Sequence, residues 1–542
     1  MYALVTAVAV VTVAAEPFDK ARLRDSVCMP RLQLPASARF RDGLLAYPDE
    51  DVFLPDEVAA CEQSISADPN NPDKYRELAE LLDRGNEKAR ADVARNKAAE
   101  LYQARLAQHP EDGVARARYA SIRNWTDEAE QIDEDFRKAV ASSPKEWECL
   151  LLRSQFLVRR MAELVAPAAK GRFGPAAVTD AVRSGHLTEA KVREAQRLFD
   201  ESSQSLDRAA ALAPNKSEVY VRRAALGSFE VMLVWAKQAL KGEPTSWEAM
   251  SGCMYQHSQD LWRAAFAAPQ DSRLLGTAAY VELAKARKNP IVSSLAADKT
   301  LSLPADSRKA VVWAAGELRR LAAADDVLTK TKAAEMLALV NILFDEPLGA
   351  ESFLAGVVRQ RPSLEAAWDL EIASLRGRPE KAAAAVALCQ ERLRYKDAPR
   401  NHLLLAASYL EAKQPAEARK ALEAALKKLP DSLECSLGVA SLLMRSGDVH
   451  ELDRAGHLLE LCSLLARIEP TEQNMLNYAI LHCQYFALTD RLDELRKLNA
   501  DLKEWRIRDE RLVEFEKLVG PEMLKDPAAT APILPVSGSF NK

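Results

Sequence analysis

The most constraining feature of this sequence is a helical phrase that recurs along it. At 401–430 the chain reads NHLLLAASYLEAKQPAEARKALEAALKKLP, with apolar residues three and four positions apart in each half and a proline at the end. That period places the apolar residues on one face of a helix. A single helix pair cannot bury both of its apolar faces, so a recurring pair predicts a stacked array.

Length and composition agree with an array. The 542 residues exceed what one core can hold, since single cores stop growing at roughly 250–300 residues. Hydrophobic residues make up 48% and charged residues 28%, which excludes a disordered chain. Glycine is scarce, at 19 residues, and long alternating β-branched runs are missing, so the sequence predicts an all-α protein.

Prolines that end the second helix of each pair mark the repeat length. Pro110 and Pro144 are 34 residues apart, and Pro362 and Pro430 are 68 apart, which is twice 34. The repeat is therefore a helix–turn–helix unit of about 34 residues.

The residues between these prolines resemble the tetratricopeptide repeat (TPR) family. After Pro110, Tyr119 and Ala120 take the places of the family's Leu-Gly pair on the first helix, and Phe136, Ala139 and Pro144 take the aromatic, alanine and proline places on the second. The resemblance implies an α-solenoid, a right-handed superhelix of stacked helix-turn-helix hairpins. The family's glycine is replaced by alanine or a larger residue, which predicts altered helix packing.

These patterns divide the chain into six segments. They are a possible signal peptide at 1–15, an irregular leader at 16–55, a TPR-like array at 56–270 with an insertion at 165–200, divergent helical repeats at 271–362, a TPR-like array with a capping helix at 363–525, and a disordered tail at 526–542. We expect the leader, broken by prolines including Pro48 and Pro55, to pack on the first repeat.

Signals for catalysis and for charged ligands are missing from the sequence. It has no glycine-rich nucleotide loop and no HExxH or GxSxG motif. The net charge is −5 and basic residues alternate with acidic ones, which argues against a nucleic-acid partner. The eight cysteines are scattered among apolar neighbours and read as buried residues. We therefore expect no enzyme activity, no cofactor and no metal.

The first 15 residues bear on localisation. An apolar run ends in Val13-Ala14-Ala15, which resembles a signal-peptidase site, although no basic residue precedes the run. Cleavage there would make the protein exported or periplasmic; without it the protein would be cytoplasmic. No second membrane-spanning candidate follows.

The resemblance also implies a concave groove, lined by first helices, that binds a protein or peptide partner. Carried over position by position, the groove candidates are Arg76, Glu80, Arg84, Ser121, Asn124, Trp125, Leu403, Ala407, Leu410, Leu437, Ser441 and Met444. They do not reproduce the Lys/Asn/Lys/Arg clamp of chaperone-binding members. The apolar C-terminal set suits an amphipathic helix, or cover by the chain's own helix at 500–519.

These observations favour a non-catalytic scaffold for protein–protein interaction. Two alternatives stay open at this stage. One is an exported ligand-binding or accessory subunit of a larger complex, and the other is an enzyme whose site lies in the irregular segments 160–200 or 285–360.

Overall fold

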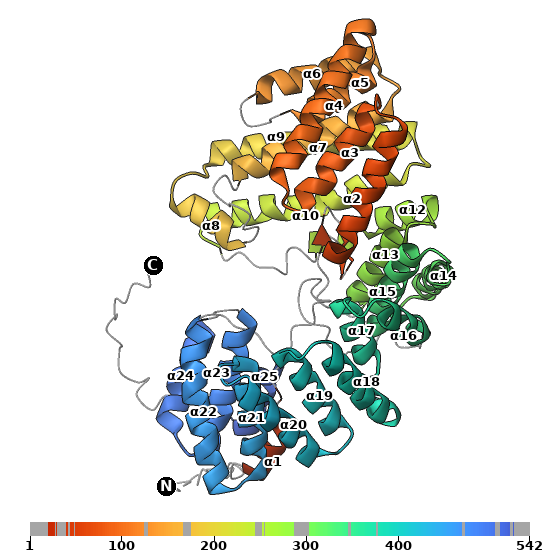
Figure 1. Cartoon of the computed structure of the whole chain (residues 1–542). Coiled ribbons are helices and arrows are strands. Elements are labelled where there is room, and N and C mark those ends of the chain that lie inside the picture. The colour runs from red at the N-terminus through yellow and green to blue at the C-terminus, as the bar shows by residue number, and fades with distance from the viewer. Residues whose placement is uncertain are drawn as a thin grey trace, which may run out of the picture. The chain divides into compact units, whose positions relative to one another are not determined.

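The computed structural model of the chain is built almost entirely from α-helices (Figure 1). It describes residues 20–27, 29, 40–41, 44–47, 49–123, 128–165, 175–243, 252–253, 255–286, 303–344, 348–375, 378–468, 472–504, 510–520 and 524. The proposed signal peptide and C-terminal tail lie outside these ranges. The helices group into two compact units, residues 34–374 and residues 1–33 with 375–542.

The larger unit, residues 34–374, begins with a short antiparallel pair of strands in which Phe40 faces Leu45. Its elements are β1 (Phe40–Arg41), β2 (Leu44–Leu45), α2 (Glu50–Ala67), α3 (Pro72–Arg84), α4 (Lys88–Gln108), α5 (Gly113–Ile122), α6 (Ala129–Ser142), α7 (Trp147–Val165), α8 (Pro175–Arg183), α9 (Glu189–Leu212), α10 (Ser217–Leu240), α12 (Ser258–Ala267), α13 (Ser272–Ala286), α14 (Ala305–Ala322), α15 (Val327–Leu343), α16 (Ala350–Gln360) and α17 (Glu365–Leu375).

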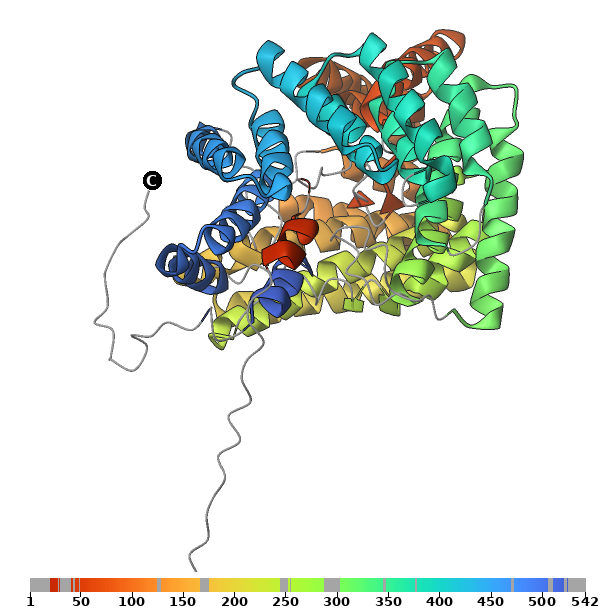
Figure 2. The ribbon, with the colours of Figure 1, turned by 90° about the horizontal axis from the view of Figure 1, so that it is seen from below.

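The second unit contains the C-terminal helices together with one short helix from the start of the chain. Its elements are α1 (Lys20–Ser26), η1 (Pro379–Lys381), α18 (Ala382–Tyr395), α19 (Pro399–Glu411), α20 (Pro415–Lys428), α21 (Leu433–Ser446), α22 (Val449–Ile468), α23 (Glu472–Leu488), α24 (Leu492–Glu504) and α25 (Glu510–Val519). Figure 2 shows α1, in red, among the blue helices of this unit.

Consecutive helices pack as antiparallel pairs, because small residues let them approach closely. The pairs include α3 with α4, α5 with α6, α19 with α20 and α21 with α22. Alanines that replace the family's glycine, namely Ala120, Ala224, Ala406 and Ala440, are all buried. An all-α array of helix-turn-helix hairpins is thus confirmed, and alanine is small enough to keep these helices in contact.

The turn between repeats follows from local chemistry at the prolines. Helix α4 ends at Gln108, just before Pro110, whose ring cannot continue the helix. The side chain of Asp112 then accepts a hydrogen bond from the Ala115 amide at 2.8 Å and caps α5. Ser432 caps α21 in the same way, through the amide of Cys435 at 3.1 Å.

The structure differs from the sequence-based segments in the leader. Helix α2 begins at Glu50 and continues through Pro55, since a proline near the start of a helix removes only one internal hydrogen bond. Earlier in the leader, α1 packs against α21, α23 and α25. Leu23 of α1 is buried in this contact, because α21, α23 and α25 present an apolar surface to it.

Two other segments consist largely of helices where the structure describes them. Within the expected insertion at 165–200, α8 packs on α10, and α9 begins at Glu189 as the partner of α7. Within the divergent stretch at 271–362, helices α13 to α16 pack in sequence.

In the described part of the chain the cysteines are buried thiols, as the sequence predicts. They are Cys61, Cys149, Cys253, Cys389, Cys435, Cys462 and Cys483. Each helix in these ranges is too short or too polar to cross a bilayer.

Two helical glycines provide a test of close packing. A Cβ atom at Gly276 in α13 would lie 2.9 Å from the Cβ of Met336 in α15, whereas a Cβ at Gly316 in α14 would meet nothing within 4 Å. We expect Gly276→Ala to lower the free energy of unfolding by about 1–3 kcal/mol through overpacking. Gly316→Ala should raise it by about 0.5–1 kcal/mol through helix propensity. Urea denaturation followed by circular dichroism measures both changes, and equal effects of the two substitutions would contradict the packing.

Candidate functional site

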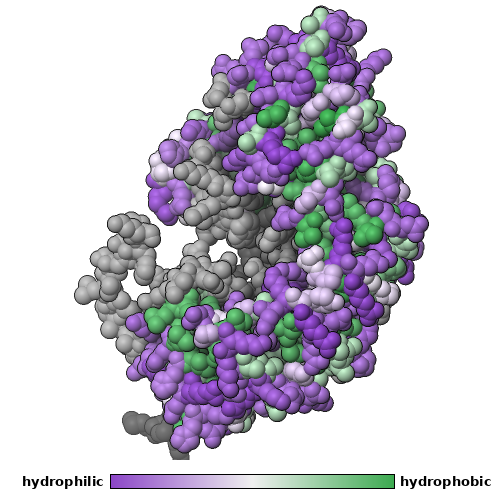
Figure 3. Space-filling model, viewed as in Figure 1, coloured by the Kyte–Doolittle hydropathy of each residue, from purple (hydrophilic) through white to green (hydrophobic). Residues whose placement is uncertain are grey.

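A polar groove crosses the N-terminal repeats of the larger unit. It has a volume of about 990 Å³ and is lined by side chains of α3, α4, α5 and α7. The expected groove residues Arg76, Glu80 and Ser121 all line it, together with Tyr119 and Arg123. On the side seen in Figure 3, the surface of these repeats is mainly hydrophilic, with scattered apolar side chains.

Side chains of the groove are held in ion pairs. Arg76 bonds Glu80 at 3.0 Å one turn along α3, and Arg123 pairs with Glu128 and Asp135. Burial alone would lower the pKa of Arg76, but Glu80, Tyr102 and Asp73 together outweigh it and the pKa is raised. The groove therefore carries many charged side chains, but their opposite charges nearly cancel.

A partly buried hydrogen-bond network joins α3, α4, α5 and α7. The hydroxyl of Tyr102 in α4 donates to Asp73 in α3, and Arg118 in α5 pairs with the same carboxylate. Arg118 also donates two hydrogen bonds, at 2.6 and 2.8 Å, to Glu148 in α7. Because this fork–fork geometry has one favoured orientation, it sets the spacing of three consecutive first helices.

Other predicted residues lie elsewhere. Arg84 lies at the C-terminal end of α3, outside the polar groove, and pairs with Glu57 of α2. Asn124 and Trp125 fall in 124–127, outside the described residues. The groove assignment of those two positions stays a prediction.

Helix α13 of the larger unit is contacted by the chain's own leader. The Leu45 amide donates to Thr277 Oγ1 at 3.0 Å, and Arg273 Nε donates to the Leu45 carbonyl at 2.6 Å. Tyr47 and Ser272 share a hydroxyl hydrogen bond of 3.0 Å. The leader thereby follows α13 as an extended peptide would.

Asp49 anchors the end of this leader. Its carboxylate accepts the Ala366 and Ala367 amides at 3.1 and 3.0 Å, so it caps α17 from a distant part of the chain. Glu335 of α15 lies beside it and is fully buried. Burial raises the pKa of Glu335 well above its ordinary value, and the Asp49 carboxyl raises it further. Burial and the neighbouring acid thus shift Glu335 toward its protonated, uncharged form.

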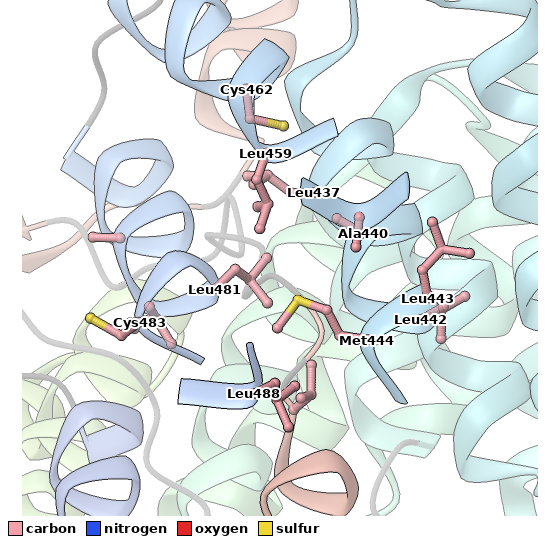
Figure 4. Close-up of a cluster of buried hydrophobic side chains, with 14 of the residues drawn as sticks. Leu437, Ala440, Leu442, Leu443, Met444, Leu459, Cys462, Leu481, Cys483 and Leu488 are labelled. Carbon is pink, nitrogen blue, oxygen red and sulfur yellow. The ribbon is translucent and has the colours of Figure 1, made fainter. Parts of the chain in front are cut away.

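The C-terminal candidates lie in an apolar core. Leu403, Leu437, Ser441 and Met444 are buried, while Ala407 and Leu410 are half-buried. Figure 4 shows Leu437 and Met444 of α21 beside Leu459 of α22 and Leu481 of α23. The same cluster includes Leu23 and Val27 of the leader and Phe515 of α25. Two segments of the chain therefore already pack on this cluster, and one of them is α25, which lies within the stretch 500–519 expected to cover it.

Sequence reasoning missed the leader's role and one surface feature. The four-residue spacing of Leu23 and Val27 is a signal that could have identified α1 as an amphipathic segment. On the outer surface, Phe266 is 57% exposed, and its ring lies 4.6 Å from that of Trp313 and 5.9 Å from that of Trp262. Tertiary packing creates this cluster, because the three side chains come from α12 and α14.

Metal-binding chemistry is not evident in the site. Among the residues that the structure describes, no group of three or more His, Cys, Asp or Glu side chains could hold a metal ion.

No family model matches this chain, and no curated protein matches its sequence. The solved structures that it resembles are TPR proteins. Yeast Tom70 is 14% identical over 84% of this chain and 96% of that chain, with a TM-score of 0.28. The P58(IPK) TPR domain is 13% identical over 81% and 99%, with a TM-score of 0.18. A human IFIT1 dimer with m7Gppp-AAAA is 11% identical over 82% and 94%, with a TM-score of 0.23. Scores this low carry no argument about function, and the fold class rests on the helix pairs of this chain.

The raised pKa of Glu335 beside Asp49 predicts a pH dependence. A carboxyl whose pKa is raised on folding contributes stability below its unfolded pKa, and this stability is lost as the pH rises through the folded pKa. Glu335→Gln keeps a donor for Asp49 without a titrating proton. We expect the melting temperature of the natural chain to fall more steeply from pH 5 to pH 9 than that of Glu335→Gln.

A matched control is Glu80→Gln, which removes one carboxylate at an exposed position. Its melting temperature should follow that of the natural chain across this pH range. Parallel curves for all three proteins would show that the Asp49–Glu335 pair does not bind a proton on folding.

Proposed function

We propose that this chain is a non-catalytic scaffold that binds an extended polypeptide segment in the polar groove of its N-terminal repeats. The observation that carries the proposal is the groove itself, which is open, about 990 Å³ in volume and lined by four helices of three successive hairpins. A groove of this kind offers many contacts along its length, as extended peptides require.

The charges of the groove indicate what kind of segment it suits. Its described lining includes four arginines, Arg76, Arg95, Arg123 and Arg159, and four carboxylates, Glu80, Asp83, Asp92 and Glu128. A balanced set favours a partner with both acidic and basic side chains over a polyanion. Exposed ion pairs are worth only about 0–1 kcal/mol, so a partner's charges can replace the existing pairs at little cost.

An apolar strip on the groove floor supplies an anchor point. Tyr119 and Ile122 of α5 lie there with Leu152 of α7. The guanidinium of Arg123 lies over the Tyr119 ring, 5.6 Å from its centroid. Aromatic residues beside arginine are frequent at binding hot spots, so an apolar side chain of the partner is expected here.

Selection from a random peptide library on the full-length chain tests this function directly. Ser121→Trp places a large ring in the groove, and we expect it to weaken binding of the selected peptides by at least about tenfold, or about 1.4 kcal/mol. The matched control is Glu100→Trp, on α4 but outside the groove lining, which should bind them as the natural chain does.

The selected sequences provide a second readout. Glu80→Lys should shift the library toward acidic residues, because it reverses one charge of the lining. If no peptide is enriched, or if Ser121→Trp and Glu100→Trp bind equally well, the groove is not a peptide site.

A further inference from the structure

In the second unit, a short helix from the start of the chain packs against helices of the C-terminal repeats. Helix α1 contacts α21, α23 and α25. Leu23 of α1 and Val27, the residue that directly follows α1, are four positions apart and fully buried there. At its N-terminal end, Lys20 Nζ lies 2.5 Å from a carboxylate oxygen of the exposed Asp490. The contacts thus include two apolar anchors and one ion pair.

The site also binds the polar end of α1. The last carbonyls of a helix lack partners within it. Arg445 of α21 supplies one, because its Nε lies 2.8 Å from the Val27 carbonyl and its Nη2 lies 2.5 Å from it. Beyond that carbonyl, Ser441 Oγ lies 3.1 Å from the sulfur of Met29. The Arg445 side chain therefore fixes the position of the end of this segment through hydrogen bonds, which apolar packing alone would not do.

Gly447, at the end of α21, leaves room for a basic side chain of α1. It has a φ of 78°, in the left-handed region that favours glycine, and the guanidinium of Arg24 packs against it. A Cβ atom at Gly447 would lie 2.7 Å from Arg24 Nη1. The surface therefore accommodates a basic side chain where any larger residue would collide with it.

Helix α1 depends on this surface for its order. It has seven residues, fewer than an isolated helix needs to be stable in water. It is separated by more than 400 residues from the side chains that hold it, as the Arg445–Val27 separation of 418 shows. Two anchors at i and i+4 are the pattern by which an amphipathic helix binds a groove. The same contacts can therefore form with a helix that is not covalently attached.

We propose that α21, α23 and α25 form a binding site for a short basic amphipathic helix of a partner protein, and that residues 20–29 are its built-in, displaceable ligand. The partner helix carries two aliphatic residues four positions apart, a basic residue near its N-terminal end for Asp490, and a backbone carbonyl at its C-terminal end for Arg445. This site uses other repeats than the polar groove, so the proposal stands or falls independently of the function proposed above.

A synthetic peptide of residues 18–29, with serine at the position of Cys28, is the probe. Its binding is measured by fluorescence anisotropy to the full chain and to the full-length Leu23→Asp variant. Because the attached α1 competes in the natural chain, we expect the peptide to bind Leu23→Asp at least tenfold more tightly. A peptide carrying Leu23→Asp should not bind, whereas one carrying Asp25→Ala, at an exposed position, should bind like the parent. No binding of the parent peptide to a folded Leu23→Asp chain would overturn the proposal.

Hydrogen exchange on the natural chain keeps the test valid if Leu23→Asp does not fold. Excess peptide should accelerate exchange of the amides of residues 20–27 while α21 and α23 remain protected. Exchange of α1 at the rate of α21, unchanged by peptide, would show that α1 is a fixed part of the core. A dimer that the peptide converts to monomers would place the α1 of a second copy in the site and would also overturn the built-in ligand.

Discussion

The close approach of successive helices is the constraint on which the rest of the structure depends. Buried alanines at Ala120, Ala224, Ala406 and Ala440 make this approach possible, and larger apolar residues fill the space to the next pair. At Gly276 the helices are so close that even a methyl group would collide with Met336. Each pair is stable because its neighbours cover its apolar faces, so stability is shared along the array.

Both units bind segments from the beginning of the chain. In the larger unit, Leu45 and Tyr47 lie along α13, and Asp49 caps α17. In the other unit, α1 occupies the surface of α21, α23 and α25. The two attachments use different chemistry: backbone hydrogen bonds with a buried acid pair in the first, and two apolar anchors with an arginine in the second. The described lining of the polar groove of α3, α4, α5 and α7 includes neither segment.

The candidate site could be predicted in part. Arg76, Glu80 and Ser121 were placed by repeat register alone, and the structure brings them together in one groove. The apolar residues Leu437 and Met444 were assigned by the same register, but in the structure they are buried with Leu23 and Val27. Register predicts which side of a helix faces inward. It does not predict whether a distant segment of the chain covers that side, because such contacts depend on tertiary structure.

By itself, the sequence determined the all-α class, the helix-turn-helix repeat and the burial of the cysteines, because helical period, alanine content and proline spacing act over a few residues. Tertiary structure alone decided the partners of the leader and the pairing of Asp49 with Glu335. It also created the Tyr102–Asp73–Arg118–Glu148 network. These features join residues from about 30 to more than 400 positions apart, and no local pattern encodes which of many polar or apolar side chains will meet at such separations.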